Sequence, residues 1–168
     1  MSDELDKLAA QVGAVLKAKG EKRARGAKSL LLATAESCTG GGIAEAITRI
    51  PGSSAWFDRA FVTYSNEAKV EMLGVESNVI DRYGAVSDAV VRQMAEGALA
   101  RSKAHVAVAV TGVAGPDGGT VEKPVGTIWF AWVVRDKSII SERCVFKGDR
   151  AAIRHQTIVH ALNKLLHN

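Results

Sequence analysis

Cysteine is scarce in this chain. Only Cys38 and Cys144 occur among 168 residues, far apart and outside any C-x-x-C pair, and none of the four histidines forms a pair at the spacing of metal ligands. Structural zinc sites and disulfide frameworks both depend on closely patterned cysteine and histidine. The sequence therefore predicts no metal site and no structural disulfide, and Cys38 is expected to pack as a small buried side chain.

Long apolar runs are also missing. No segment approaches the ~20 consecutive apolar residues that cross a bilayer. The first residues include Asp3, Glu4, Asp6 and Lys7 before any apolar run develops, which a secretory signal does not allow. We therefore expect a soluble, cytoplasmic protein that does not engage a membrane.

Aromatic residues and excess charge are limited too. Aromatic side chains make up 5% of the sequence, and 22 Lys and Arg face 18 Asp and Glu, for a net charge of +4 and a pI near 9.2. Proteins that bind nucleic acids combine clustered basic residues with aromatic rings for base stacking. The one basic stretch here, residues 17–28, is short and broken by glycines, so we expect a solvated loop there and no nucleic-acid partner. A small anionic ligand remains compatible with the charge.

What the chain does have is a core of ordinary size and a regular order of elements. At 47% hydrophobic residues, the composition predicts a single domain over residues 1–168. Helical periods are expected over 2–19, 43–50, 66–73, 77–83, 88–101 and 149–165, and strands over 29–34, 59–64, 105–110, 126–134 and 138–146. Strands alternate with helices early and pair directly late, which predicts an α/β fold, a three-layer α/β/α sandwich on a mixed β-sheet.

The stretch Thr34-Ala-Glu-Ser-Cys-Thr-Gly-Gly-Gly42 joins the first strand to a helix. Such a turn projects one small polar side chain, Ser37 or Cys38, and points the amides of Thr39, Gly40 and Gly41 outward at the helix start. A hydroxyl beside free amides is how acyl-transfer enzymes present a serine and bind its oxyanion, although the G-x-S-x-G elbow is absent. A plain glycine-rich helix cap is the alternative interpretation.

Polar residues also follow other strands. Tyr64 and Thr111 end two strands in this prediction, and ligands of α/β folds collect at the carboxyl ends of strands, where Ser37 also lies. The glycine-rich loop that begins at Gly112 and includes Gly115 offers backbone amides to a phosphate. Arg150, at the start of the last helix, could add a second anion contact.

A serine nucleophile needs a base. His105 begins a strand at the opposite end, and the other three histidines lie in or near the last helix, so a Ser-His-Asp triad is not supported. Lys69, one turn into the helix after Tyr64, could reach the same edge, and burial lowers a lysine pKa from about 10.4. A lysine exposed on the helix surface is the alternative. The Tyr64–Lys69 spacing is one residue too long for a dehydrogenase Tyr-x-x-x-Lys pair, and no dinucleotide fingerprint precedes it.

Several motifs in order resemble the CinA C-terminal domain family. They are Thr34-Ala-Glu-Ser-Cys-Thr-Gly-Gly41, Gly52-Ser-Ser-Ala-Trp-Phe57, Val62-Thr-Tyr-Ser-Asn-Glu-Ala-Lys69, Gly84-Ala-Val-Ser87, Thr111-Gly-Val-Ala-Gly-Pro-Asp-Gly-Gly119 and Lys123-Pro-Val-Gly126. The family includes nicotinamide-nucleotide amidohydrolases of the pyridine nucleotide cycle, also called nicotinamide mononucleotide (NMN) deamidases. Other members are described only by competence or DNA damage.

The resemblance implies a hydrolase that needs neither a cofactor nor a metal. Ser37 is then the nucleophile, Lys69 the general base, and Tyr64 an assistant to the lysine or to substrate orientation. It implies that amides of Thr39, Gly40 and Gly41 bind the oxyanion, and that Thr111, Gly112, Gly115 and Arg150 contact the substrate. Related domains also suggest a homo-oligomer, a dimer or larger.

Two features depart from the family pattern as we expect it: Gly42, where a larger apolar residue is usual, and the length of the basic stretch at 21–28. Neither touches the nucleophile. The competing hypothesis is a non-catalytic nucleotide-binding or regulatory domain linked to competence or DNA damage. The joint presence of Ser37, Tyr64 and Lys69 favours the enzyme.

Overall fold

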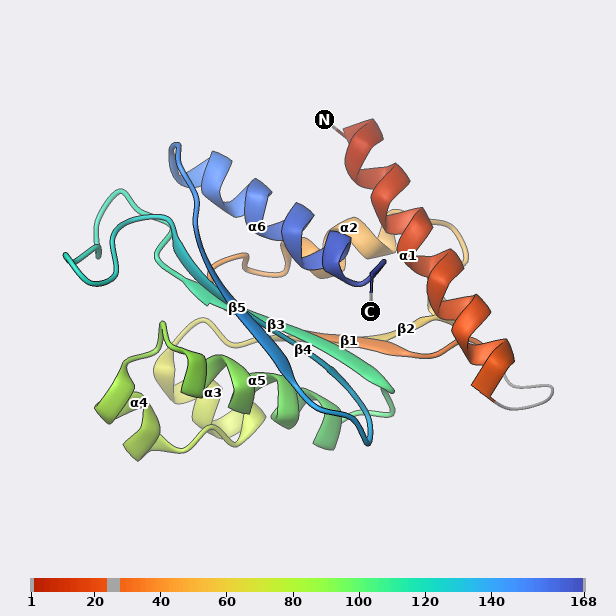
Figure 1. Ribbon diagram of the computed structural model, residues 1–168, viewed down its shortest axis with the longest axis horizontal. Helices are drawn as coiled ribbons and strands as arrows, with labels where there is room; N and C mark the ends of the chain where they lie inside the picture. Colours follow the sequence, from red (N-terminus) through yellow and green to blue (C-terminus); the bar gives the residue numbers. More distant parts are fainter. Residues whose placement is uncertain (1, 24–27, 168) are drawn as a thin grey trace.

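The computed structural model describes residues 2–23 and 28–167, which form a five-stranded mixed sheet between two layers of helices (Figure 1). The strand order is β2-β1-β3-β4-β5. The predicted α/β/α sandwich on a mixed sheet is therefore confirmed.

The sheet divides into a parallel and an antiparallel half. Strands β1 (Leu32–Glu36), β2 (Phe57–Val62) and β3 (Val106–Gly112) run parallel, and β1 lies between the other two. Strands β4 (Thr127–Val134) and β5 (Ile140–Val145) continue the sheet antiparallel from β3. Because β1 and β3 are covered on both faces, their residues are almost all buried, and β3 begins with a continuous apolar run.

Each face of the sheet carries its own helical layer. Helices α1 (Ser2–Arg23), α2 (Gly42–Thr48) and α6 (Arg150–Lys164) lie on one face, and α3 (Asn66–Leu73), α4 (Ser77–Tyr83) and α5 (Asp88–Ala100) on the other (Figure 1). A short 3₁₀ turn, η1, spans Ser53–Ala55. Two apolar clusters separated by the sheet correspond to these layers.

Three helices begin at side-chain caps. Ser65, Ser87 and Asp149 accept hydrogen bonds from the amides of Ala68, Val90 and Ala152, respectively. Each cap satisfies one of the amides that lack a partner in the first helical turn. The Ser65 cap fixes where α3 starts, and therefore where Lys69 lies along it.

The element bounds differ from the prediction in three places that matter. Strand β1, expected over 29–34, spans Leu32–Glu36 and so ends directly before Ser37. Helix α1 continues to Arg23, whereas the sequence suggests a solvated loop from residue 17; the rest of that basic stretch, 24–27, lies outside the described residues. Strand β2 starts at Phe57, because Phe57 pairs with Leu32, and ends at Val62. Tyr64 therefore lies beyond the strand, in the loop that leads to α3. In the described ranges, no helix combines the length and the apolar character needed to cross a membrane.

Candidate active site

Ser37 follows directly after β1, at the carboxyl end of the parallel strands. Its amide donates to the carbonyl of Val110 in β3 at 3.2 Å, so the backbone of the turn is anchored to the sheet. The side chain is only 7% exposed. A serine held in this way has a fixed position and little access to bulk water.

Lys69 brings an amine to the serine from the opposite helical layer. Its side chain is 1% exposed, and Nζ lies 3.0 Å from Ser37 Oγ. The same nitrogen lies 2.9 Å from the carbonyl oxygen of Thr63 and 3.1 Å from that of Tyr64. The alternative of a lysine on the helix surface is excluded, because this side chain is buried and directed at Ser37.

The burial of Lys69 lowers its affinity for a proton. Loss of hydration disfavours the ammonium and lowers the pKa of Lys69 below its ordinary value of 10.5, with a smaller opposing effect from Cys38. A neutral amine has two N–H donors and one lone pair. The carbonyls of Thr63 and Tyr64 can accept from those two donors, the carbonyl of Ser65 lies farther away at 3.5 Å, and the Ser37 hydroxyl at 3.0 Å can offer its proton to the lone pair. The geometry therefore fits a general base.

The structure also distinguishes the two small polar side chains of the turn. Cys38 is 5% exposed, and burial raises the pKa of its thiol to about 12. A thiol with so high a pKa is not ionised at neutral pH and is a poor nucleophile. Of the two, Ser37 alone is paired with the amine.

Glu36 is the main residue of this site that the sequence analysis missed. The carboxylate is fully buried and accepts four hydrogen bonds, from the hydroxyls of Thr34 and Thr39 and from the amides of Ile43 and Ala44. It caps α2 in place of Gly41, which has no side chain to do so. The signal available in the sequence was an acidic residue at the end of an apolar strand, immediately before a glycine-rich helix start.

Two amides of the turn already donate hydrogen bonds to carbonyls of the same turn. Gly40 donates to the Ser37 carbonyl at 3.0 Å, and Gly42 donates to the Thr39 carbonyl at 2.9 Å. Within the described part of the chain, no acceptor faces the amides of Thr39 and Gly41. The sequence placed the amides of Thr39, Gly40 and Gly41 in one role, whereas the structure separates Gly40, which closes the turn, from the other two.

A second residue missed by the sequence analysis holds the same turn from α6. Arg154 donates from Nε to the Cys38 carbonyl at 3.1 Å and from its guanidinium to the Thr39 carbonyl at 3.0 Å. Two carbonyls fixed by one planar guanidinium restrict the peptide orientations of the turn. Helix α6 therefore supports the site as well as covering the sheet.

Tyr64, Arg150 and Gly115 come together at the rim. Tyr64 is 62% exposed, and its hydroxyl accepts a hydrogen bond from Arg150 at 3.1 Å. Arg150 also donates to the Gly115 carbonyl at 2.7 Å, which ties the glycine-rich loop to the start of α6. Tyr64 meets Lys69 through its backbone carbonyl, while its phenol points toward the arginine.

Thr111 and Gly112 end β3 next to the serine turn. The Thr111 side chain is buried, and its hydroxyl donates to the Ala85 carbonyl at 3.0 Å. Gly112 lies against β4, where a Cβ atom would be 2.8 Å from the Thr127 carbonyl oxygen. Thr111 therefore joins the loop before α5 to the sheet, and Gly112 allows the strands to approach closely.

The histidines lie away from Ser37, and one buried hydroxyl near Lys69 lacks a partner among the described residues. His105 accepts a hydrogen bond from the Leu31 amide at the opposite end of the sheet, and in the described residues no histidine contacts Ser37. A cavity of about 600 Å³ also lies at that opposite end, lined by residues of α1, the start of β3 and the end of β4. Beside the lysine, the buried hydroxyl of Thr63 has no hydrogen-bond partner among the described residues.

The comparisons with known proteins agree on a family. The model of the CinA C-terminal domain matches residues 6–168. A nicotinamide-nucleotide amidohydrolase PncC from Enterobacter agglomerans is 52% identical over 96% of this chain and 93% of its own length. A protein of the same name from Escherichia coli K12 is 51% identical over 96% of this chain and 93% of its own length. The crystal structure of the competence/damage inducible protein CihA from Agrobacterium tumefaciens superposes with a TM-score of 0.89 at 44% identity, covering 97% of this chain and 94% of that one. The chain belongs to the CinA C-terminal domain family.

Proposed function

We propose that this protein is an amidohydrolase that converts nicotinamide mononucleotide to nicotinate mononucleotide and ammonia, a step of pyridine nucleotide recycling. The observation that carries the proposal is the 3.0 Å contact between Lys69 Nζ and Ser37 Oγ, made by a lysine that is 1% exposed. A nucleotide-binding or regulatory domain gains nothing from a buried amine directed at a hydroxyl. The two PncC relatives, similar over nearly their full lengths, support the substrate.

The reaction proceeds through an acyl-enzyme. Ser37 Oγ attacks the carboxamide carbon while Lys69 Nζ takes the hydroxyl proton. The tetrahedral intermediate collapses, the C–N bond breaks, and Lys69 returns the proton to the leaving ammonia. Water then attacks the ester and gives one proton to Lys69, which passes it to Ser37 Oγ as the ester bond breaks and nicotinate mononucleotide leaves.

The amides of Thr39 and Gly41 stabilise the oxyanion of this intermediate. Both face no acceptor among the described residues, and both belong to the turn that Glu36 and Arg154 hold in place. A preorganised amide in such a role is worth roughly 10²- to 10³-fold in rate. Gly40 contributes by closing the turn through the Ser37 carbonyl.

The rim binds the rest of the nucleotide. Arg150 is exposed at the start of α6, and the loop that begins at Gly112 and includes Gly115 is adjacent to it. The phosphate of the substrate pairs with the Arg150 guanidinium, and the Tyr64 ring, next to the arginine, orients the substrate. Thr111 holds the loop before α5 beside this rim. The chemistry needs no metal ion or organic cofactor, because lysine supplies the base and backbone amides supply the electrostatic stabilisation. Homo-oligomerisation and a cytoplasmic location remain predictions.

The test is ammonia release from nicotinamide mononucleotide, measured under chelator for wild type, Ser37→Ala and Lys69→Met. We expect activity in wild type and a loss of at least 10³-fold in each variant, because one removes the nucleophile and the other the base. Lys103→Met is the matched control, since Lys103 is exposed and precedes the start of β3, whereas Ser37 follows the end of the parallel strand β1. A wild type that binds the nucleotide without releasing ammonia would sink the enzyme proposal and favour the binding domain.

A further inference from the structure

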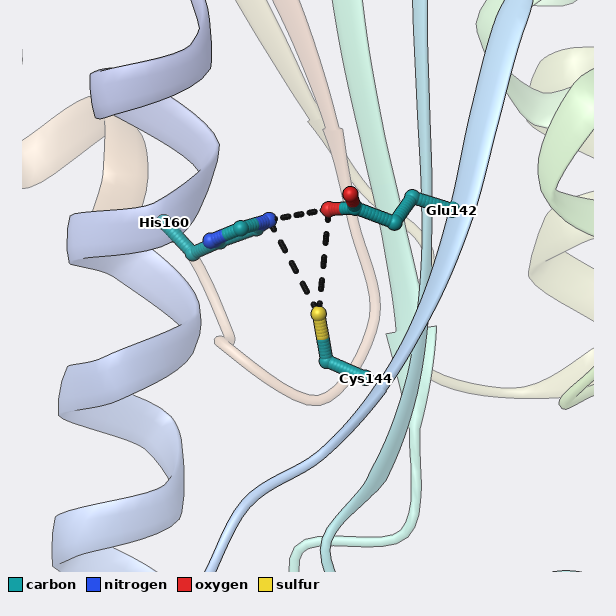
Figure 2. A group of neighbouring side chains, drawn as sticks. All are labelled: Glu142, Cys144 and His160. Carbon is teal, nitrogen blue, oxygen red and sulfur yellow. Dashed lines mark hydrogen bonds and ion pairs between the residues drawn. The ribbon is translucent and has the colours of Figure 1, made fainter.

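Three side chains with metal-binding atoms meet between β5 and α6. Figure 2 shows Glu142 and Cys144 extending from the strand toward His160 on the helix. The ligand atoms Oε1, Sγ and Nε2 lie within 4.8 Å of one another. None of these residues takes part in the proposed amidase reaction.

The strand period explains the arrangement. Glu142 and Cys144 are two residues apart on β5, so both side chains point to the same face of the sheet. In the register with β4 they pair with Phe130 and Ile128, which belong to the apolar cluster under α1, α2 and α6. Helix α6 crosses this face and presents His160 to both.

The distances approach those of a tetrahedral zinc site. Sγ of Cys144 lies 3.7 Å from Nε2 of His160 and 3.7 Å from Oε1 of Glu142. With bonds of about 2.3 Å to sulfur and about 2.0–2.1 Å to nitrogen or oxygen, a tetrahedral ion separates sulfur from either atom by about 3.6 Å. The carboxylate and the imidazole are in hydrogen-bond contact and need to part to about 3.4 Å, a movement of side chains alone.

The donor set selects the class of metal. A thiolate, an imidazole and one carboxylate suit zinc and its neighbours, whereas magnesium and calcium prefer oxygen alone. The side chains of His160 and Glu142 are 30% and 37% exposed, so an ion can enter and a water molecule can complete the fourth position.

The surroundings hold the ligands in place. The His160 ring packs against Phe130 with ring centroids 4.7 Å apart, and against Trp132 and Phe146 at 5.9 and 6.1 Å.

We propose that Glu142, Cys144 and His160 form a three-residue site for one zinc ion that tethers α6 to β5. The simpler alternative is an ion pair between His160 and Glu142 with an uninvolved thiol beside it. The tether matters for the site because α6 also carries Arg150 and Arg154, which reach the rim and the serine turn. The tether itself takes no part in the amidase reaction.

The test is metal binding by tag-free, chelator-stripped protein over its full length. Titration with zinc alone is expected to show one ion per chain, and cobalt is expected to give a thiolate-to-metal charge-transfer band. Cys144→Ala and His160→Gln should each weaken zinc binding at least tenfold and should abolish the zinc-dependent rise in melting temperature. Melting temperatures without metal establish that each variant is folded.

Matched controls use the other cysteine and another histidine of α6. Cys38→Ala and His155→Gln are expected to bind zinc as wild type does. If either ligand variant does not fold, the cobalt spectrum of wild type together with Cys38→Ala assigns the thiolate to Cys144. Absence of zinc binding, a cobalt spectrum without thiolate character, or affinity reduced less than tenfold in the ligand variants refutes the site.

Discussion

Replacement of Glu36 by glutamine tests whether the buried carboxylate positions Ser37, the proposed nucleophile. Each carboxylate oxygen accepts one hydroxyl and one backbone amide of α2. Glutamine keeps one oxygen and introduces an NH₂ group, so one backbone amide of α2 then faces a donor. The threonine hydroxyl on that side can rotate to accept, but the backbone amide cannot.

The structure sets the size of the effect. The side-chain amide is expected to turn its NH₂ toward Ala44, which is less buried than Ile43. Loss of one acceptor for a largely buried donor costs about 1–3 kcal/mol, and the remaining bonds weaken because they no longer involve a charge. We expect the free energy of unfolding to fall by roughly 2–4 kcal/mol, out of a total near 5–15 kcal/mol for a domain. The variant therefore still folds.

Activity should fall as well, because Ser37 follows Glu36 directly and the turn contains the proposed oxyanion amides. A displacement of about 1 Å in such a site reduces the rate by about 10²-fold. Chemical denaturation and ammonia release, measured below the unfolding transition, check both effects. The control is Glu45→Gln: Glu45 is exposed on α2 and pairs with Arg49, so we expect a change of about 0.5 kcal/mol or less. If Glu36→Gln matches Glu45→Gln in stability and in rate, the positioning role is refuted.

Three further outcomes follow from the same geometry. The kcat/KM of the amidase should rise with pH as Lys69 loses its proton, and the pKa of that rise should lie below 10.5 because burial disfavours the ammonium. A rise at the ordinary pKa of lysine contradicts a buried base. Arg150→Met should raise KM for nicotinamide mononucleotide about tenfold with little change in kcat, measured by initial rates, whereas an equal loss in kcat argues against a phosphate contact. Thr63→Val should raise the free energy of unfolding by about 1 kcal/mol, since it removes a buried hydroxyl without a partner in the described chain; a less stable variant in denaturant titration shows that the hydroxyl is satisfied.

Helix caps and strand composition made most of the fold predictable. Helix starts can be recognised from residues whose side chains cap the first turn, here Ser65, Ser87 and Asp149. Buried strands such as β3 can be recognised as apolar runs. The same local logic failed for α1, where charged residues suggested a loop and the helix continues to Arg23. Helix ends depend on packing as well as on propensity, so composition alone misplaces them.

Only part of the candidate site could be predicted from the sequence. Family motifs indicated Ser37 and Lys69, and the order of strands and helices placed both at one edge of the sheet. The roles of Glu36 and Arg154 were hidden, because a carboxylate that caps a helix from the preceding strand and an arginine that reaches back from α6 leave no spacing signature. The same holds for the cluster of Glu142, Cys144 and His160, where two strand residues meet a histidine 16 or more residues further along the chain only after α6 docks.

The sequence by itself determined the sandwich, the serine turn and the presence of a lysine one turn into α3, since periodicity, caps and glycine positions act over a few residues. Only the tertiary structure decided that this lysine is buried against the serine, that its pKa is lowered, and that Tyr64 turns its phenol toward Arg150 instead. Desolvation and long-range hydrogen bonds depend on which surfaces pack together, and residues far apart in the chain share those surfaces only once the sheet and both helical layers are assembled.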